Sequence, residues 1–462
     1  MPPRLASLLT FAFIGYLFLR DGRARPNVTG ALWLPVGWLF LIGSRYVSQW
    51  LDLFGISAGG SSVEEGSPLD AVVFFGLIAA GLLVLNRRGV NFGVFARNNR
   101  CLTAFLFYCL LAIVWSDFPL VSLKRWIKIV GHPVMAMILF TEPDLEEAIT
   151  TLMKRCAFIL VPVSFLFIKY YPEWGRGFSD WTGEGYNRGI ALGKNDLGYV
   201  CLILGAFFFW HLLKIRRVEK STARNQELLF TAGFLAMIWW LLWMANCKTA
   251  LVALLIAVVT MLIVGFRFVD RQSIGAYLVA AVLMFLAADC AFGVSQEVIK
   301  LLGRNPTLTD RTEVWQDVLE VPINPVLGTG FESFWLGERR EKIAEKWAWQ
   351  PNQAHNGYLE TYLNLGIVGL VILISLIFAT YRKACGELLE NFEFGRFRLS
   401  LLFAIAIYNW TDATFKALHP IWFTFYVIAI DYPNQTKDVE ESSQCVGLGQ
   451  DPDFVFEGFP AK

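Results

Sequence analysis

The run TALVALLIAVVTMLIVGF, residues 249–266, decides the fold class of this chain because it contains no charged residue. A helix needs about 20 predominantly apolar residues to cross the hydrocarbon core of a membrane. Comparable apolar runs occur near residues 5–19, 31–50, 70–86, 101–115, 126–140, 152–168, 190–212, 227–245, 274–292, 355–380, 399–410 and 418–431. We therefore predict an all-α polytopic membrane protein with about 12 transmembrane helices, the first of them a retained N-terminal segment.

The composition also indicates a membrane protein. Hydrophobic residues make up 55% of the 462 residues and charged residues 17%, whereas soluble domains contain about 25% charged residues. The mean hydropathy is +0.48. The eight cysteines include no CxxC pair, which predicts small apolar core residues rather than disulfides or metal ligands. We expect no cofactor, no metal and no nucleic-acid partner.

Lysine and arginine in short loops set the predicted orientation, because they favour the cytoplasmic side. Three strongly basic loops are predicted to be cytoplasmic: Arg87, Arg88, Arg97 and Arg100; Lys214, Arg216, Arg217, Lys220 and Arg224; and Arg382, Lys383, Arg396 and Arg398. Counting spans alternately then places residues 169–189 and 293–354 on the outer side. We predict an integral membrane domain over 1–431, with 293–354 as its large periplasmic loop, and a disordered, acidic cytoplasmic tail over 432–462.

The longest polar interruption of the chain covers residues 304–360. Within it, Asp310 and Glu313 fit a capping box that starts a helix of about ten residues, ending before Pro322. Arg311 then lies in the first turn, where its guanidinium and the partial positive charge of the helix end both suit a phosphate or diphosphate. The alternative is that Arg311 only pairs with Asp310 or Glu313 at the surface.

The same loop contains an aromatic residue, a turn and a second helix. Trp315 lies one helical turn after the arginine, on the same face, where its ring could stack on a sugar or line a lipid cleft. Pro325, Gly328 and Gly330 form a turn, which is either a tight structural connection or a direct ligand contact. Residues 338–349 resemble a short amphipathic helix on the membrane face, of the kind that can form a lid.

His355 lies where the loop re-enters the membrane, directly before an apolar run. A histidine at the mouth of a membrane cavity can remove a proton near neutral pH. Tyr358 follows on a neighbouring turn, and Asn356 and Glu360 share a second helix face, so these three are candidate substrate-binding residues. The alternative is an interfacial histidine that only forms hydrogen bonds.

Two further basic clusters are predicted on the outer side. Arg188, Lys194 and Asn195 lie where another outer loop enters a span, and Lys124 and Arg125 lie near the outer end of a third. Basic residues on this side run against the usual bias, and an arginine at the head of a membrane helix needs an anionic partner. We therefore expect both clusters to bind substrate; the alternative is an orientation that is wrong by one span.

Four motifs occur in a fixed order: TLTDRTEVW (307–315), NPVLGTGF (324–331), AHNGYLE (354–360) and GIVGL (366–370). Together they resemble the O-antigen ligase/polymerase (Wzy-type) family, and most closely its exopolysaccharide-polymerase, ExoQ-like branch. The motif block covers a small part of the chain, and the pattern of spans extends the likeness to most of the rest. Relatives often carry glycine where this chain has Asp310, a departure that affects the cap more than the chemistry.

This resemblance implies a membrane glycosyltransferase with a GT-C-like fold and a cavity that opens to the outer side. The donor would be an undecaprenyl-diphosphate-linked glycan, whose reducing-end sugar moves to a hydroxyl of an acceptor glycan with inversion and without a metal. By likeness, Arg188 and Arg311 would hold the diphosphate and His355 would activate the acceptor. The protein would lie in the bacterial inner membrane, with its active site facing the periplasm.

Three functions stay open at this point. The motifs favour a polymerase of lipid-linked repeat units, with a chain-length regulator or an export complex as a further partner. The alternative within the family is a ligase that moves the glycan to lipid A-core or another acceptor. The third hypothesis is a lipid-linked sugar flippase. A transporter would carry its charged groups near the middle of the membrane, whereas here the charged groups gather in outer loops.

Overall fold

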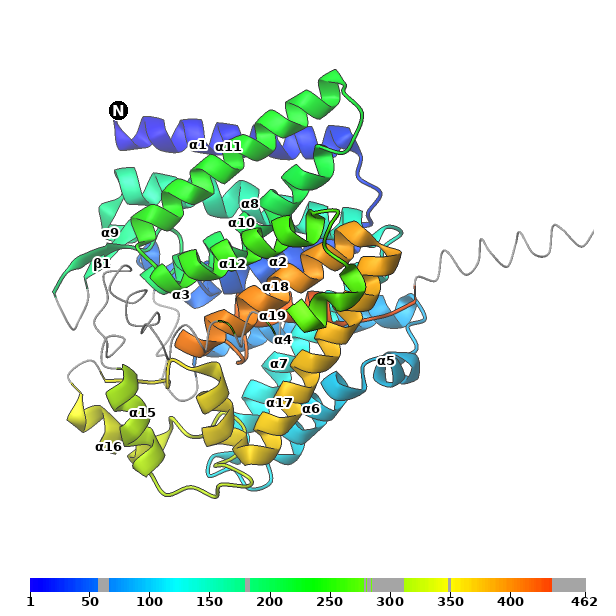
Figure 1. Ribbon diagram of the computed structural model, residues 1–462. Coiled ribbons are helices and arrows are strands. Elements are labelled where there is room, and N and C mark those ends of the chain that lie inside the picture. Colours follow the sequence, from blue (N-terminus) through cyan, green and yellow to red (C-terminus); the bar gives the residue numbers. More distant parts are fainter. Residues whose placement is uncertain are drawn as a thin grey trace, which may run out of the picture.

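The computed structural model describes residues 1–56, 66–178, 183–277, 280, 284, 311–347 and 350–433 (Figure 1). The described chain is helical apart from two short strands, β1 (Arg176–Phe178) and β2 (Gly185–Asn187), which pair in an antiparallel sense. This result agrees with the predicted all-α class. Most of the predicted tail and most of the apolar run near 274–292 lie outside the described residues.

Seven helices among the described residues are long and apolar enough to cross a membrane. They are α1 (Pro3–Ala24), α4 (Pro68–Arg87), α8 (Leu145–Tyr170), α10 (Lys194–Ile215), α11 (Thr222–Ala245), α12 (Lys248–Gly265) and α17 (Gly357–Glu390). The remaining helical elements are η1 (Gly30–Leu32), α2 (Trp33–Gly43), α3 (Val47–Leu53), α5 (Phe92–Asn98), α6 (Arg100–Leu111), α7 (Pro119–Phe140), α9 (Pro172–Gly175), η2 (Arg271–Ser273), α15 (Arg311–Glu320), α16 (Gly337–Lys346), α18 (Phe392–Thr411) and α19 (Pro420–Ala429). The protein is therefore a multi-pass helical membrane protein, while the count of about 12 spans and the GT-C-like fold stay predictions.

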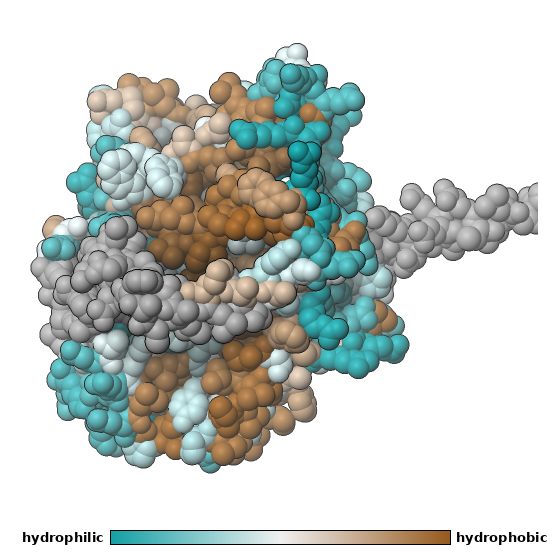
Figure 2. All heavy atoms as spheres, viewed as in Figure 1, coloured by the Kyte–Doolittle hydropathy of each residue, from teal (hydrophilic) through white to brown (hydrophobic). Residues whose placement is uncertain are grey.

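The surface has the layering that a membrane imposes. Apolar residues cover the middle of the face in Figure 2, and polar residues gather at its two ends. On α1, Leu8, Phe11 and Leu19 are 66%, 61% and 64% exposed, as expected of side chains that face lipid. Elements α9, β1, α15 and α16 lie at one end of the bundle and α5 lies at the other (Figure 1). The described parts of the two predicted outer loops therefore share one end.

One predicted span is broken. The run 31–50 forms α2 and α3, which are separated at Ser44 to Tyr46, rather than one helix. Arg45 lies in the break, and its guanidinium donates hydrogen bonds to the carbonyls of Ile190 (3.0 Å) and Trp174 (2.7 Å). The buried arginine needs these carbonyl partners, and bending the chain at this point brings it to them.

Several other helices are longer than predicted, and α7 and α18 show why. Helix α7 begins at Pro119 rather than near 126, because proline suits the first turn of a helix. Helix α18 begins at Phe392 rather than near 399, and Asn391 caps it by accepting a hydrogen bond from the N–H of Phe394 at 3.3 Å. Each helix begins at a proline or a polar capping residue that lies outside the apolar run. Hydropathy alone therefore placed the start of each helix too late.

Helix α17 is broken at Gly366, whose φ of 64° lies in the left-handed region. The turn 325–330 lies in this break. Hydrogen bonds in both directions join turn and helix: Ile367 N to Pro325 O (3.0 Å), Val368 N to Val326 O (3.3 Å), Thr329 N to Leu363 O (3.1 Å) and Gly330 N to Asn364 O (2.9 Å). A Cβ atom on Gly366 would lie 2.2 Å from the oxygen of Val326, so only glycine fits. The turn and the first part of α17 therefore form one rigid unit.

Candidate active site

His355 is held at the start of α17 by its neighbours. The side chain of Asn356 caps the helix and accepts a hydrogen bond from the N–H of Tyr358 at 3.0 Å. The N–H of Gly357 donates to the carbonyl of Asp412 at 3.1 Å. His355 itself has a φ of 49°, a left-handed conformation that is uncommon outside glycine and that tends to occur at functional sites.

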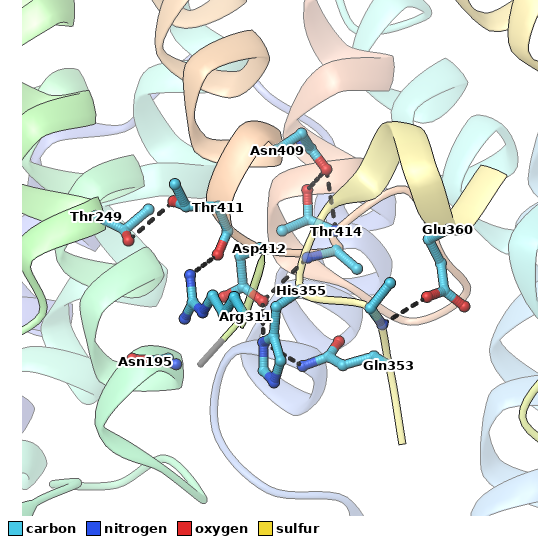
Figure 3. Close-up of polar contacts among 12 residues, drawn as sticks. Asn195, Thr249, Arg311, Gln353, His355, Glu360, Asn409, Thr411, Asp412 and Thr414 are labelled. Atoms are coloured by element: carbon cyan, nitrogen blue, oxygen red, sulfur yellow. Dashed lines mark hydrogen bonds and ion pairs between the residues drawn. The ribbon is translucent and has the colours of Figure 1, made fainter. Parts of the chain in front are cut away.

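His355 and Asp412 form a hydrogen-bonded pair (Figure 3). Nδ1 of His355 lies 3.3 Å from Oδ1 of Asp412, and the hydroxyl of Tyr408 donates to the other carboxylate oxygen at 3.4 Å. Gln353 Nε2 also lies 3.2 Å from Nδ1, and Gln353 Oε1 accepts from Nζ of Lys416 at 2.7 Å. An ionised carboxylate can only accept, so we assign Nδ1–H as the donor to Asp412. Nδ1 then accepts no hydrogen bond from Gln353, and the imidazole lone pair lies on Nε2.

The surroundings keep the imidazole neutral. Burial lowers the pKa of His355, the Asp412 carboxylate raises it, and the cations of Arg311 and Lys416 lower it; the result lies below the ordinary 6.5. Burial raises the pKa of Asp412, but the hydrogen bond from His355 and the two cations outweigh burial and hold this pKa below its usual range. An ionised carboxylate thus orients a neutral imidazole that can accept a proton near pH 7.

Arg311, the first residue of α15, approaches the same site from another element. Its Nη1 donates to the carbonyl of Thr411 at the end of α18, and its charge lowers the pKa of His355. One turn further on, Trp315 Nε1 donates to the carbonyl of Ala354 at 2.7 Å. The first turn of α15 is therefore docked against the residue that precedes the histidine, and Figure 3 shows Arg311 beside the imidazole.

Helix α15 has the predicted length. It covers Arg311–Glu320 and ends before Pro322, which confirms the ten-residue helix expected from the sequence. Asp310 lies outside the described residues, so its role as N-cap stays a prediction. Glu313 is exposed in the first turn.

Helix α16 occupies the position predicted for the amphipathic helix. Its apolar residue Ile343 is 3% exposed and packs in one cluster with Val314 and Val318 of α15. Trp347 packs against this cluster, and its Nε1 donates to Asp317 at 2.7 Å. The apolar face of α16 therefore covers α15, contrary to the expectation that it lies on the membrane.

The start of α12 contacts both α10 and α18, close to the carbonyl that Arg311 binds. Two side-chain contacts hold it there: Thr411 Oγ1 to Thr249 Oγ1 (3.0 Å) and Cys247 Sγ to Asn195 Oδ1 (3.6 Å). Lys248 is the first residue of α12, and it lies in sequence between these two contacts. Asn195 and Lys248 are therefore brought to the part of the molecule where Arg311 binds the end of α18.

A groove of about 250 Å³ begins at Lys248 and lies between α11 and α12. Its lining residues are Trp239, Leu242, Trp243, Asn246, Cys247, Lys248 and Leu251. Trp239 and Trp243 are 54% and 76% exposed, as is common for aromatic residues at a membrane interface. An apolar groove with a cation at its end suits an amphiphile with an anionic head.

Arg188 lies with a second arginine, Arg45. Its Nε and Nη2 donate to the carbonyls of Trp174 (3.1 Å) and Glu173 (3.2 Å), and Arg45 donates to the same Trp174 carbonyl. Within the described ranges, neither arginine forms an ion pair with a carboxylate. Arg45 is buried, whereas Arg188 is half-buried, so Arg188 is the one that an anion could reach. Lys194, the first residue of α10, is half-buried. The pairing of Arg188 with Arg311 stays a prediction.

Lys124 and Arg125 lie on α7 at a separate cleft of about 560 Å³. Arg125 Nη1 donates to the carbonyl of Glu332, and its Nε lies 3.9 Å from the Glu332 carboxylate. Gln353, which lies next to the imidazole, and Lys416, which bonds to Gln353, also line this cleft. Lys124 and Arg125 therefore belong to a different group from Arg188 and Lys194, and their cleft is connected to His355 through Gln353.

Three predicted substrate-binding residues make contacts within the protein. Asn356 caps α17, the hydroxyl of Tyr358 donates to the carbonyl of Ala406 at 2.9 Å, and Glu360 accepts from Trp335 Nε1 at 3.0 Å. These contacts position the start of α17 and the loop before it. Contact of the three residues with substrate stays a prediction.

The sequence reading missed four charged residues of this region: Arg45, Lys248, Asp412 and Lys416. Lys248 directly precedes the apolar run 249–266 and Asp412 directly follows another, so a charge at the edge of an apolar run was the available signal. Among the described residues, no three His, Cys, Asp or Glu side chains come together as a candidate metal site.

Known proteins resemble this chain over the same region. A sequence model of the O-antigen ligase family matches residues 228–374. The exopolysaccharide production protein ExoQ of Rhizobium meliloti is 25% identical over 304 residues, which cover 62% of this chain and 66% of that protein. A Rickettsia felis protein named as a candidate polysaccharide ligase is 30% identical over 100 residues, which cover 20% of this chain and 25% of that protein. This chain thus spans less than two thirds of the length of both relatives. Residues 228–374 are thus similar to the O-antigen ligase family, which agrees with the resemblance of the motifs at 307–370.

Proposed function

We propose that this protein is a membrane glycosyltransferase that joins undecaprenyl-diphosphate-linked oligosaccharide repeat units into an exopolysaccharide or O-antigen chain. The reaction would take place on the periplasmic side of the bacterial inner membrane. The observation that carries the proposal is the His355 imidazole, which is bonded to Asp412 and lies beside Arg311; both His355 and Arg311 fall inside the region that matches the O-antigen ligase family. The name of the ExoQ relative favours exopolysaccharide production.

In the proposed donor site, the diphosphate lies against Arg311 and Lys248, and the polyprenyl chain follows the apolar groove between α11 and α12. The leaving group carries two or more negative charges, so fixed cations are the stabilisation that it needs. Arg188, together with Arg45 and Lys194, would add positive charge on the path by which the lipid-linked glycan enters. Asn195 would fix the polar end of the groove.

The proposed chemical step is a direct displacement. Nε2 of His355 takes the proton of an acceptor hydroxyl while the hydroxyl oxygen attacks C1 of the reducing-end sugar of the donor. The bond between C1 and the phosphate oxygen breaks, and the electron pair leaves with the lipid diphosphate, whose charge Arg311 stabilises. One displacement inverts the anomeric centre, and no covalent glycosyl-enzyme is formed.

A ligase is the second candidate, because the matching family and the Rickettsia felis relative both carry that name. It would use the same donor and differ only in its acceptor. A deletion strain separates the two functions by its glycans. We expect single lipid-linked repeat units on the outer leaflet and no long chains, with long chains restored by the wild-type gene. Long chains that persist on the lipid carrier would identify a ligase, and units confined to the inner leaflet would identify a transporter.

Replacing Asp412 with asparagine should move the acid limb of the pH–rate profile to lower pH. The carboxylate raises the pKa of His355, so its removal lowers that pKa, and the neutral imidazole persists to more acidic pH. Turnover should also fall by roughly tenfold or more, because an orienting partner supplies part of the effect of a positioned base. The measurement is the rate of chain elongation by the purified protein as a function of pH.

The matched control for this variant is Asp317→Asn. Asp317 makes its hydrogen bonds to Lys346 and Trp347, each at 2.7 Å, so its replacement should leave the acid limb in place. An Asp412→Asn profile that overlays the wild-type profile would show that the carboxylate does not act on His355.

A further inference from the structure

The cleft beside α7 is separate from the proposed donor site. It lies between α3, α6, α7 and α17 and has a volume of about 560 Å³, within the roughly 300–1,000 Å³ of small-molecule sites. Gln353 lines it and also lies 3.2 Å from Nδ1 of His355. In Figure 3, Gln353 and Arg311 extend from opposite sides of His355. A ligand in the cleft would therefore approach the imidazole from the side opposite the leaving group.

The walls of this cleft carry an excess of positive charge. Its lining includes Lys124, Arg125 and Lys128 of α7 and Lys416 from the segment between α18 and α19. The carboxylates among the lining residues are Glu332 and Glu360. Both are engaged by the protein, since Glu332 accepts from the N–H of Ala417 at 2.8 Å and Glu360 from Trp335 at 3.0 Å. Arg125 pairs with Glu332, and among the described lining residues the four cations still outnumber the two carboxylates, which favours an anionic ligand.

Many of the other lining residues are of the types that bind sugars. They are the aromatic residues Tyr46, Phe105, Trp335 and Phe415 and the amides Gln49, Asn352, Gln353 and Asn364. An aromatic ring packs against the apolar face of a sugar, while amide groups bond to its hydroxyls. The cations come from two separate elements, α7 and the segment between α18 and α19, rather than from one helix end. Cations from separate elements suit charges distributed along a chain better than one compact diphosphate.

We propose that this cleft binds the acceptor glycan and that the acceptor is an acidic oligosaccharide, with carboxylate groups on its sugars. Lys128 and Lys416 would bind carboxylates, Trp335 and Phe415 would stack on sugar rings, and Gln353 would guide the acceptor hydroxyl to His355. The role as acceptor site rests on the proposed function. The preference for an acidic glycan rests on the cleft alone.

Binding to the full-length protein in lipid nanodiscs tests this proposal with two probes that differ only in charge. They are a tetrasaccharide of β-1,4-linked glucuronic acid and cellotetraose, which has the same backbone without carboxylates. The wild-type protein should bind the uronate at least about tenfold more tightly, and added salt should weaken this binding. Equal affinity for both probes would overturn the proposal, and this comparison needs no variant to fold.

Variants then locate the site. Lys128→Gln should weaken uronate binding by about tenfold, while Lys342→Gln, a surface lysine of α16 whose side chain is 77% exposed, should not change it. Uronate affinity that is the same in Lys128→Gln and wild type would overturn the assignment to this cleft. Inorganic pyrophosphate that displaces the uronate with equal strength would show a phosphate site and would also overturn it.

A second pair of measurements separates this inference from the proposed function. His355→Gln should bind the uronate as wild type does, because the cations of the cleft are intact, and should fail to elongate chains. If the wild-type protein bound the uronate in a manner that depends on Lys128 but showed no transferase activity, the acidic-glycan site would stand and the transferase would be refuted. Elongation of acidic and neutral acceptors with equal efficiency would refute the acceptor assignment and leave the transferase standing.

Discussion

Replacing His355 with glutamine should slow chain elongation by about 10²–10⁴-fold, the contribution expected of a positioned general base. Glutamine keeps a hydrogen-bonding group near Asp412 but cannot take a proton from the acceptor hydroxyl. The affinity for the lipid-linked donor should change little, since its diphosphate binds to arginine and lysine. The measurement is single-turnover elongation by purified protein, with donor binding determined on the same sample.

His211→Gln is the control for this variant. His211 is paired with Glu227, with Nε2 at 3.1 Å from the carboxylate, and takes no part in the proposed site. Its replacement should leave elongation near the wild-type rate. If His355→Gln kept more than about a tenth of wild-type turnover, a loss far smaller than that of a base, the histidine would have only a structural role.

Neutralising Arg311 should cost about 10²–10³-fold in turnover, the scale seen when one group that stabilises developing charge is removed. In Arg311→Gln, the diphosphate would leave without its nearest cation. Arg311→Lys should recover only part of the rate, because an ammonium is a point charge that cannot bind two phosphate oxygens side by side. The measurement is turnover with a natural lipid diphosphate donor.

The same variant makes a second prediction. The charge of Arg311 lowers the pKa of His355, so in Arg311→Gln this pKa rises and the acid limb of the residual activity moves to higher pH, opposite to the shift expected for Asp412→Asn. Arg339→Gln is the matched control, because Arg339 lies in the same loop and pairs with Asp117. Loss of activity in Arg339→Gln as large as in Arg311→Gln would indicate general damage to the loop.

Features encoded by neighbouring residues could be predicted from the sequence. The length of α15 follows from a capping pattern at its start and Pro322 after its end. The position of His355 at the start of a helix follows from the apolar run behind it. The general class of helical membrane protein follows from apolar runs that are long enough to span a bilayer.

Features that depend on distant contacts could not be predicted in this way. The break between α2 and α3 reflects carbonyl partners of Arg45 that come from Trp174 and Ile190, far along the chain. Asp412 is separated from His355 by an entire helical hairpin, and no spacing rule links them. Lys416 is linked to the histidine through Gln353, and its place at the site depends on how the chain returns after α18.

The hydrogen bonds between the turn 325–330 and the break at Gly366 require that parts of the protein fold in a fixed order during synthesis. The turn leaves the ribosome before α17 does, so the helix N–H and carbonyl groups that it will bond are not yet made. It can take its final form only after α17 has entered the bilayer, and His355 reaches Asp412 only after α18 has followed. If His355 and Asp412 act as proposed, the nascent protein would stay inactive until its last helices are inserted.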